Sequence, residues 1–309
     1  MTSSSPFERV FSSRPDRGGL DRATEIHATG TFRVRHHLGE TQAALVMRER
    51  DTRIEAAVEG LLLEFAGNTW FTESFWPENE QRVRLILEDI LGRLPTPARL
   101  LDVGCFNGFL SLLIKRLGYE VTATDAVSMP ERDEMLGRHG IEFFYSNLNR
   151  PSPFEEASGS LFDAVIMGEV IEHVLNHPLG LMRDVARVLR PRGLLLITTP
   201  NPSTAINALR VLTGRASLWG TKAFLEFPKI VNGQVTDIGD VHFREYRTSE
   251  LADLVTTAGF AVDQVRYFAF GTSRQQPRIK RWIKGNVLGR LLMRHRLFGA
   301  TQYLLATRV

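Results

Sequence analysis

The stretch LLDVGCFNG at residues 100–108, with an acid (Asp125) at the end of the next apolar run, decides the fold of this 309-residue chain. Its pattern predicts a buried strand that enters a glycine loop, and a helix that begins directly after Gly108. In parallel α/β sheets this layout binds a nucleoside-bearing cofactor at the carboxyl edge of the sheet. The loop lacks the Gly-x-Gly-x-x-Gly spacing of dinucleotide-binding loops, and Asp102 precedes its first glycine. This carboxylate would repel a pyrophosphate and attract a cofactor with a cationic amino-acid end.

Apolar runs alternate with helical patterns from Pro95 to the end of the chain. The predicted strands cover residues 99–103, 120–124, 142–144, 164–167, 194–198, 260–265 and 302–307. The predicted helices cover residues 109–117, 170–175, 181–189 and 249–258. This alternation predicts an α/β fold, with a doubly wound, mostly parallel sheet of seven strands.

The sequence also predicts how the chain is organised around this sheet. Residues 1–20 are expected to form a disordered tail, and residues 21–94 an N-terminal helical extension or lid. The cofactor-binding domain would then occupy residues 95–309. Two stretches inside it, 200–240 and 271–299, exceed the usual length of connections in such sheets. Both leave the carboxyl ends of predicted strands, so we expect them to be insertions on the substrate side.

Charge is distributed unevenly along the chain. Residues 1–263 contain 28 basic and 35 acidic side chains, whereas the last 46 residues contain ten basic and no acidic ones. Most of this excess lies in residues 274–296, where basic and apolar side chains are interleaved. Three partners fit such a segment: an anionic membrane surface, a phosphorylated acceptor or RNA. A solvated basic cap over the active site is the fourth interpretation.

The sequence also gives expectations about location and assembly. The chain has a single cysteine, Cys105, and no apolar run of membrane-spanning length. We therefore expect a cytoplasmic protein, with peripheral membrane contact through residues 274–296 as an alternative. The N-terminal helices could cap the site or pair two subunits in a homodimer.

The glycine loop and the motifs after it resemble those of the class I S-adenosylmethionine (SAM) methyltransferases, over about residues 70–270. The resemblance implies that Asp102 faces the amino group of SAM, Asp125 the ribose hydroxyls and Asn147 the adenine amino group. Two residues depart from the family's pattern: Phe106 stands where glycine is common, and Asn147 where aspartate is frequent. The cofactor-binding residues expected on this basis are Asp102, Gly104, Cys105, Phe106, Gly108, Asp125, Asn147, Leu148 and Gly168.

A cluster of acids and histidines follows the fourth predicted strand, in the sequence FDAVIMGEVIEHV (residues 162–174). We expect a helix that begins with Glu169 and carries Glu169, Glu172 and His173 on one face, at i, i+3 and i+4. His242, at the end of the first insertion, returns to the same edge of the sheet. Carboxylates and imidazoles beside a cofactor could bind a divalent cation. Without a metal, His173 or His242 is the candidate general base, Glu169 an acid–base group, and a purely structural role stays open.

The pattern Glu-x-x-Glu-His with a later His-Phe-x-Glu resembles two methyltransferase branches. One comprises quinone-biosynthesis O-methyltransferases with their natural-product and sugar-modifying relatives, and the other the small-RNA 3′-terminal 2′-O-methyltransferases. The resemblance implies Glu169, Glu172, His173 and His242 as metal ligands. We expect a SAM-dependent O-methyltransferase that uses Mg²⁺ and acts on a hydroxyl of a sugar, polyketide or lipid-linked metabolite. The alternatives are an RNA 2′-O-methyltransferase and a non-catalytic SAM-binding regulatory protein.

Overall fold

The chain forms two compact units, Met1–Leu45 and Val46–Val309, and the sheet belongs to the second. The computed structural model describes residues 33–157, 159, 161–215, 229–231, 234–237, 241–269 and 292–309. The tail expected at 1–20 and most of the basic segment at 274–296 lie outside these residues. No helix in the described part of the chain is long and apolar enough to cross a membrane.

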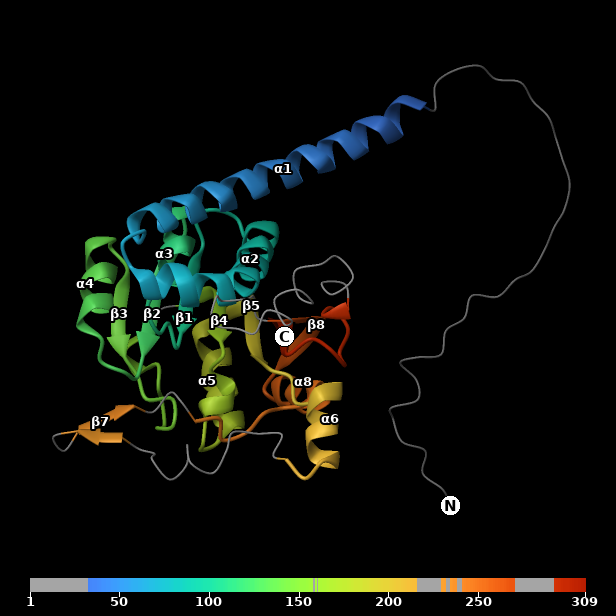
Figure 1. Ribbon diagram of the computed structural model, residues 1–309. Coiled ribbons are helices and arrows are strands. Elements are labelled where there is room, and N and C mark those ends of the chain that lie inside the picture. Colours follow the sequence, from blue (N-terminus) through green and yellow to red (C-terminus); the bar gives the residue numbers. More distant parts are fainter. Residues whose placement is uncertain are drawn as a thin grey trace, which may run out of the picture. The chain divides into compact units, whose positions relative to one another are not determined.

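Seven described strands form one sheet in the order β3-β2-β1-β4-β5-β9-β8 (Figure 1). Strands β1 to β5 run parallel, and β9 lies antiparallel between β5 and β8. The strands are β1 (Arg99–Val103), β2 (Glu120–Asp125), β3 (Glu142–Tyr145), β4 (Phe162–Gly168), β5 (Leu189–Pro200), β8 (Phe260–Phe268) and β9 (Thr301–Arg308). The prediction of a doubly wound, mostly parallel sheet of seven strands is confirmed.

The winding of the chain determines where a ligand can bind. From β1 the chain moves outward to β2 and β3, then returns to β4 on the other side of β1 and continues to β5. The strand order therefore reverses between β1 and β4, and open α/β sheets bind ligands at the carboxyl ends of strands at such a point. Strand β8 runs in the same direction as β5, so its carboxyl end lies at this edge as well.

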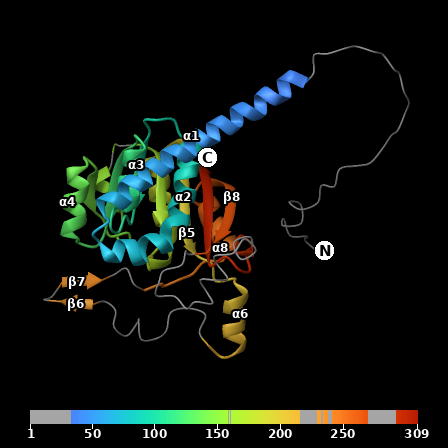
Figure 2. The same ribbon diagram turned by 45° about the horizontal axis from the view of Figure 1, so that its top comes forward.

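Helices cover both faces of the sheet (Figures 1 and 2). One face packs against α2 (Trp76–Arg93), α3 (Phe109–Arg116), α4 (Pro130–Arg138) and the later part of α1 (Arg33–Glu64). The other face packs against α5 (Pro178–Val188) and α8 (Thr248–Thr257). In β1, Leu100 belongs to the first core, and Leu101 and Val103 belong to the second. Because both faces are covered, β1 appears in the sequence as an apolar run.

Two local structures differ from the sequence-based expectation. The helix predicted at 170–175 is a single 3₁₀ turn, Ile171–His173. It stops there because Asn149 Oδ1 accepts hydrogen bonds from the amides of Leu175 and Asn176, at 2.7 and 3.0 Å, in place of helical carbonyls. Helix α4 is not among the predicted elements, because its charge-rich sequence contains few apolar residues.

Three short elements follow β5 at the carboxyl edge of the sheet (Figures 1 and 2). They are helix α6 (Ala205–Leu212) and the antiparallel hairpin of β6 (Lys229–Val231) and β7 (Gln234–Asp237). The amide of Ala205 donates to Leu297 O at 2.8 Å, which joins the start of α6 to the segment before β9. These elements belong to the stretch expected as the first insertion, 200–240. Most of the second, 271–299, is outside the described residues.

Candidate active site

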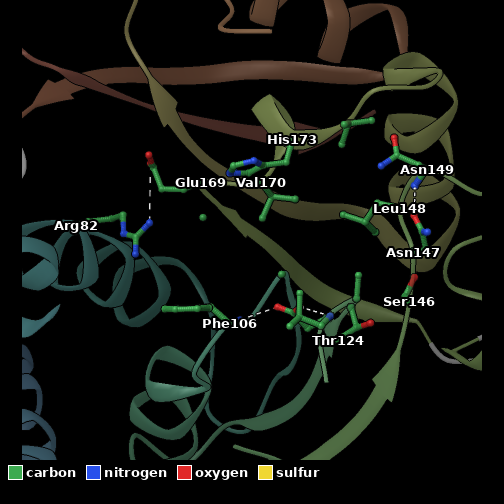
Figure 3. Close-up of a pocket in the computed structure, with 16 residues that line it drawn as sticks. Arg82, Phe106, Thr124, Ser146, Asn147, Leu148, Asn149, Glu169, Val170 and His173 are labelled. Carbon is green, nitrogen blue, oxygen red and sulfur yellow. Dashed lines mark hydrogen bonds and ion pairs between the residues drawn. The ribbon is translucent and has the colours of Figure 1, made fainter. Parts of the chain in front are cut away.

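A cavity of about 530 Å³ opens at the carboxyl ends of β1 to β4, where the strand order reverses (Figure 3). Six predicted cofactor-binding residues line it: Gly104, Phe106, Asp125, Asn147, Leu148 and Gly168. The other lining residues are Arg82, Thr124, Ala126, Val127, Ser146, Asn149, Glu169, Val170, His173 and Val174. A cavity of this size and position is typical of cofactor sites.

The glycine loop is held against β2 by its backbone. The amides of Gly104 and Cys105 both donate to Thr124 O, at 2.8 and 3.1 Å. Gly104 has a φ of 68°, and a Cβ there would lie 2.5 Å from Val170 Cγ2. Both facts require glycine at this position. The backbone of Phe106 is also in the left-handed region, with a φ of 49°, and its ring is exposed at the rim of the cavity.

Asp125, at the end of β2, is fixed by the loop that it faces. Its Oδ2 accepts from Phe106 N and its Oδ1 from Val127 N, both at 2.8 Å. Arg132 Nη1 lies 3.9 Å from Oδ1. Each carboxylate oxygen has a further lone pair, so Asp125 can still accept from two ribose hydroxyls.

Asn147 and Leu148 lie on the opposite side of the cavity from Arg82 and Glu169 (Figure 3). The Asn147 Oδ1 accepts from the amide of Asn149 at 3.0 Å. The sequence predicts that Asn147 accepts a hydrogen bond from the adenine amino group. This hydrogen bond would have to use the second lone pair of Asn147 Oδ1.

Asp102, Cys105 and Gly108, also predicted to bind the cofactor, do not line the cavity. Asp102 is buried, its Oδ2 accepts from Ser111 Oγ at 2.6 Å, and burial raises its pKa to about 6. The Cys105 thiol is buried too, which raises its pKa. A Cβ on Gly108 would lie 2.9 Å from Met135 Cε, so this glycine serves the contact with α4. In the structure these three residues stabilise the conformation of the glycine loop without lining the cavity.

Arg82 on α2 is the site residue that the sequence analysis misses. Its side chain lines the cavity, and its Nη1 lies 3.9 Å from Glu169 Oε1 (Figure 3). Two residues later, Arg84 points elsewhere and pairs with Glu55 and Glu80. Nothing in the local sequence distinguishes the two arginines, because only the packing of α2 on the sheet decides which one faces the cavity.

The aromatic residues before and at the start of α2 divide between the core and the cavity rim. Phe71 and Trp76 are buried in the core. Trp70 is 47% exposed, and its ring centroid lies 6.1 Å from that of Phe106 and 5.3 Å from that of Phe75. The segment before α2 therefore places aromatic rings beside the glycine loop.

The acid–histidine cluster follows β4 but does not lie on a helix. Glu169 has a left-handed φ of 59°, and its amide donates to Thr198 O of β5 at 2.9 Å. The prediction of a helix that begins at Glu169 is wrong, because this residue still belongs to the sheet edge. A non-glycine residue in this conformation stores strain, as is common beside active sites.

Three of the four predicted metal ligands meet in the structure. One ligand atom each of Glu172, His173 and His242 lies within 4.8 Å of the other two. Glu169 is not part of this group, and its Oε1 lies near Arg82 instead.

Glu172 is fully buried and only partly hydrogen-bonded. Its Oε2 accepts from Thr199 Oγ1 at 2.8 Å, but its Oε1 has no hydrogen-bond partner among the described residues. Burial, and after it the charge of Glu169, raises the pKa of Glu172 well above its usual value. The Glu172 carbonyl accepts from Phe243 N at 2.8 Å, which ties the His242 segment to this turn. A buried carboxylate oxygen without a donor is costly unless a proton or a cation joins it.

Both imidazoles have their protons placed by neighbouring acceptors. His173 Nδ1 donates to Val241 O at 2.9 Å, and His242 Nδ1 donates to Glu245 Oε1 at 3.1 Å. The nitrogen that can bind a cation is then Nε2 in both rings. Burial lowers the pKa of His173 to about 4, so this ring is neutral at pH 7. Metal-ligating histidines have this arrangement, in which the second ring nitrogen donates to a carbonyl or a carboxylate.

Several known proteins match the sequence of this chain. The family model described as "Methyltransferase domain" matches residues 75–265. The ubiquinone biosynthesis O-methyltransferase of Xanthomonas axonopodis pv. citri (strain 306) is 32% identical over 209 residues, covering 65% of this chain and 79% of that protein. Its counterpart in Xanthomonas oryzae pv. oryzae (strain PXO99A) is 41% identical over 119 residues, covering 37% of this chain and 48% of that protein.

Solved structures resemble the chain at lower identity. A SAM-dependent methyltransferase from Archaeoglobus fulgidus has a TM-score of 0.48 and 16% identity, covering 76% of this chain and 99% of that chain. The family match is independent of this likeness and includes the glycine loop, Asp125 and the turn with Glu172 and His173. The chain therefore belongs to the methyltransferase family and is a class I, SAM-dependent enzyme.

Proposed function

We propose that this enzyme transfers the methyl group of SAM to a hydroxyl oxygen of a small molecule, with a divalent cation held by Glu172, His173 and His242. The observation that carries the proposal is the buried Glu172 carboxylate. Its Oε1 has no donor within the described residues, and the carboxylate is grouped with two imidazoles. His173 also lines the cofactor cavity, so the cluster adjoins the methyl donor's site.

The cavity offers different groups at its two ends, which suggests how SAM is oriented. Asn147 and Leu148 suit adenine, and Asp125 suits the ribose hydroxyls. At the other end, Arg82 can pair with the carboxylate of the methionine part and Glu169 with its amino group. This assignment gives Glu169 the role that the sequence analysis assigns to Asp102, since Asp102 does not line the cavity.

The donor set of the cluster fits a divalent cation. A bound cation would lower the pKa of a coordinated acceptor hydroxyl and so make it a better nucleophile. Two imidazoles with one carboxylate favour first-row transition-metal ions more than Mg²⁺, which prefers oxygen ligands. We therefore expect Mn²⁺ or Zn²⁺ to bind more tightly than the Mg²⁺ expected from the sequence.

Oxygen as the acceptor atom is supported by the relatives, which are named O-methyltransferases. Sugar, polyketide and lipid-linked hydroxyls all belong to this acceptor class. His173 can bind a cation without first losing a proton, because its pKa of about 4 keeps the ring neutral at pH 7.

Transfer of labelled methyl groups tests the proposal. Purified enzyme, methyl-labelled SAM and a heat-inactivated cell extract are incubated with and without EDTA, and the products are separated into small-molecule, lipid and RNA fractions. We expect label in the small-molecule or lipid fraction, its loss in EDTA and its return with Mn²⁺. The Asp125→Ala variant, which should not hold the ribose, serves as the blank.

Other outcomes would change the account. Label in RNA would replace the small-molecule acceptor with an RNA 2′-hydroxyl. Label that EDTA does not reduce would contradict the metal and leave His173 as the candidate base. Tight SAM binding without label in any fraction would favour a regulatory SAM-binding protein.

A further inference from the structure

A second cavity, of about 600 Å³, lies between α2 and the carboxyl end of β8. Its lining residues are Gln81, Leu85, Glu88, Val265, Arg266, Tyr267, Arg294, His295 and Arg296. Gln81, Leu85 and Glu88 occur at i, i+4 and i+7, so they form one stripe along α2. Arg82, which lines the cofactor cavity, belongs to the adjacent stripe. Helix α2 therefore separates the two cavities.

The lining of this second cavity is cationic. Three guanidinium groups, those of Arg266, Arg294 and Arg296, accompany His295 and a single carboxyl group, Glu88. Arg294 and Arg296 are exposed and make no ion pair with the described part of the chain. The cavity thus has positive charge that the described residues do not neutralise.

Arg266 is held rigidly in the wall of the cavity. Its Nη2 pairs with Asp89, and the same Asp89 Oδ2 accepts from Tyr303 Oη at 2.6 Å. The guanidinium lies over the Tyr303 ring, with Cζ 4.8 Å from the ring centroid. Its Nε is buried and has no hydrogen-bond partner among the described residues. A guanidinium fixed in this way loses little entropy when it binds an acceptor from the cavity.

These groups select a particular kind of ligand. Guanidinium groups bind phosphate oxygens through paired N–H donors and stay charged at any physiological pH. The cavity is much larger than a bare ion, and Leu85, Val265 and Tyr267 offer apolar surface for an organic part. We infer that this second cavity binds a phosphate group carried by an organic molecule. The inference goes beyond the proposed methyl transfer, since it requires neither SAM nor the Glu172 cluster.

Calorimetric titration of the full-length protein with pyrophosphate tests this inference. We expect saturable binding by the wild type at low ionic strength, and at least tenfold weaker binding by the double variant Arg294→Gln/Arg296→Gln. The matched control is Arg138→Gln/Arg183→Gln, which removes the same charge from exposed positions on α4 and α5. This control should bind pyrophosphate as the wild type does, and both double variants should keep wild-type affinity for SAM.

The source of the phosphate is resolved by a parallel sedimentation assay with phosphatidylglycerol vesicles and phosphatidylcholine vesicles. A lipid headgroup would make wild type and control sediment with phosphatidylglycerol alone, and the Arg294→Gln/Arg296→Gln variant stay in solution. A soluble phosphate compound would show the pyrophosphate effect without this vesicle effect. The inference is overturned if neither probe distinguishes the two double variants. Methyl transfer is measured separately, so its failure would not be confused with this result.

Discussion

Left-handed backbone occurs at three residues of the glycine loop, Gly104, Phe106 and Gly108, and the first two have it for different reasons. At Gly104 both the φ of 68° and the proximity of Val170 exclude a side chain, and the glycine pattern alone predicts such a position. Phe106 carries an aromatic ring at a φ of 49°, which costs a non-glycine residue about 1–2 kcal/mol. The Phe106 amide donates a hydrogen bond to Asp125, and its ring contacts Trp70; both interactions help to hold this conformation. Sequence could not predict it, because the residue type disfavours it.

Replacement of Gly104 by alanine should disrupt the cofactor site. Its Cβ would lie 2.5 Å from Val170 Cγ2 at a left-handed φ, so the loop has to move. We expect SAM affinity to fall at least tenfold, measured by calorimetry. Gly140→Ala is the matched control, because Gly140 has a φ of 63° and a Cβ there would meet no described atom within 4 Å. It should lose about 1 kcal/mol of stability through strain alone and bind SAM normally; equal SAM affinity in the two variants would refute the steric argument.

Asp102 should make folding stability depend on pH. Burial raises its pKa from 3.8 to about 6, so the folded state binds this proton more tightly than the unfolded state does. The resulting stabilisation is complete below pH 4 and is lost as the pH rises through 6. Wild type should therefore lose about 2 kcal/mol relative to Asp102→Asn between pH 4 and pH 7. Urea unfolding at both pH values checks this, and parallel curves for the two proteins would show that Asp102 titrates normally.

Elements can supply site residues that their own sequence does not reveal. The amphipathic pattern of α2 predicts a helix, but only its packing shows that Arg82 faces the cofactor cavity while Arg84 pairs with Glu55. The turn after β4 shows the opposite case. Its sequence resembles a helix start, yet Glu169 remains at the sheet edge and Asn149, distant in sequence, ends the turn.

Arg82 should contribute to SAM binding through its positive charge. We expect Arg82→Gln to weaken SAM binding about tenfold, equivalent to about 1.4 kcal/mol, because the carboxylate of SAM would lose its partner. Arg84→Gln removes the same charge from the same helix and should change SAM affinity less than twofold, because surface ion pairs contribute little. Calorimetric titrations compare the two, and equal affinities would contradict the assigned role.

For the whole molecule, the sequence predicts periodic features such as strands and local features such as the glycine loop. It does not predict contacts between segments that are distant in the sequence. The strands were predictable because burial on both faces produces apolar runs. The glycine loop and Asp125 were predictable because one βαβ unit contains them. Glu172 and His242 lie close together because the Phe243 amide donates a hydrogen bond to the Glu172 carbonyl. No local sequence pattern specifies this contact. Resemblance to known families supplied this pair, and the structure provides its geometry.

The central claim is that a divalent cation binds beside the methyl donor, and Mn²⁺ binding tests it most directly. Electron paramagnetic resonance can count the Mn²⁺ ions bound in the presence of S-adenosylhomocysteine, without knowledge of the acceptor. We predict one ion per chain in the wild type and in the control Glu131→Gln, an exposed acid on α4. Glu172→Gln should weaken binding at least a hundredfold, since it removes the only carboxylate among the three proposed ligands Glu172, His173 and His242. Equal Mn²⁺ affinity in wild type and Glu172→Gln would contradict the account.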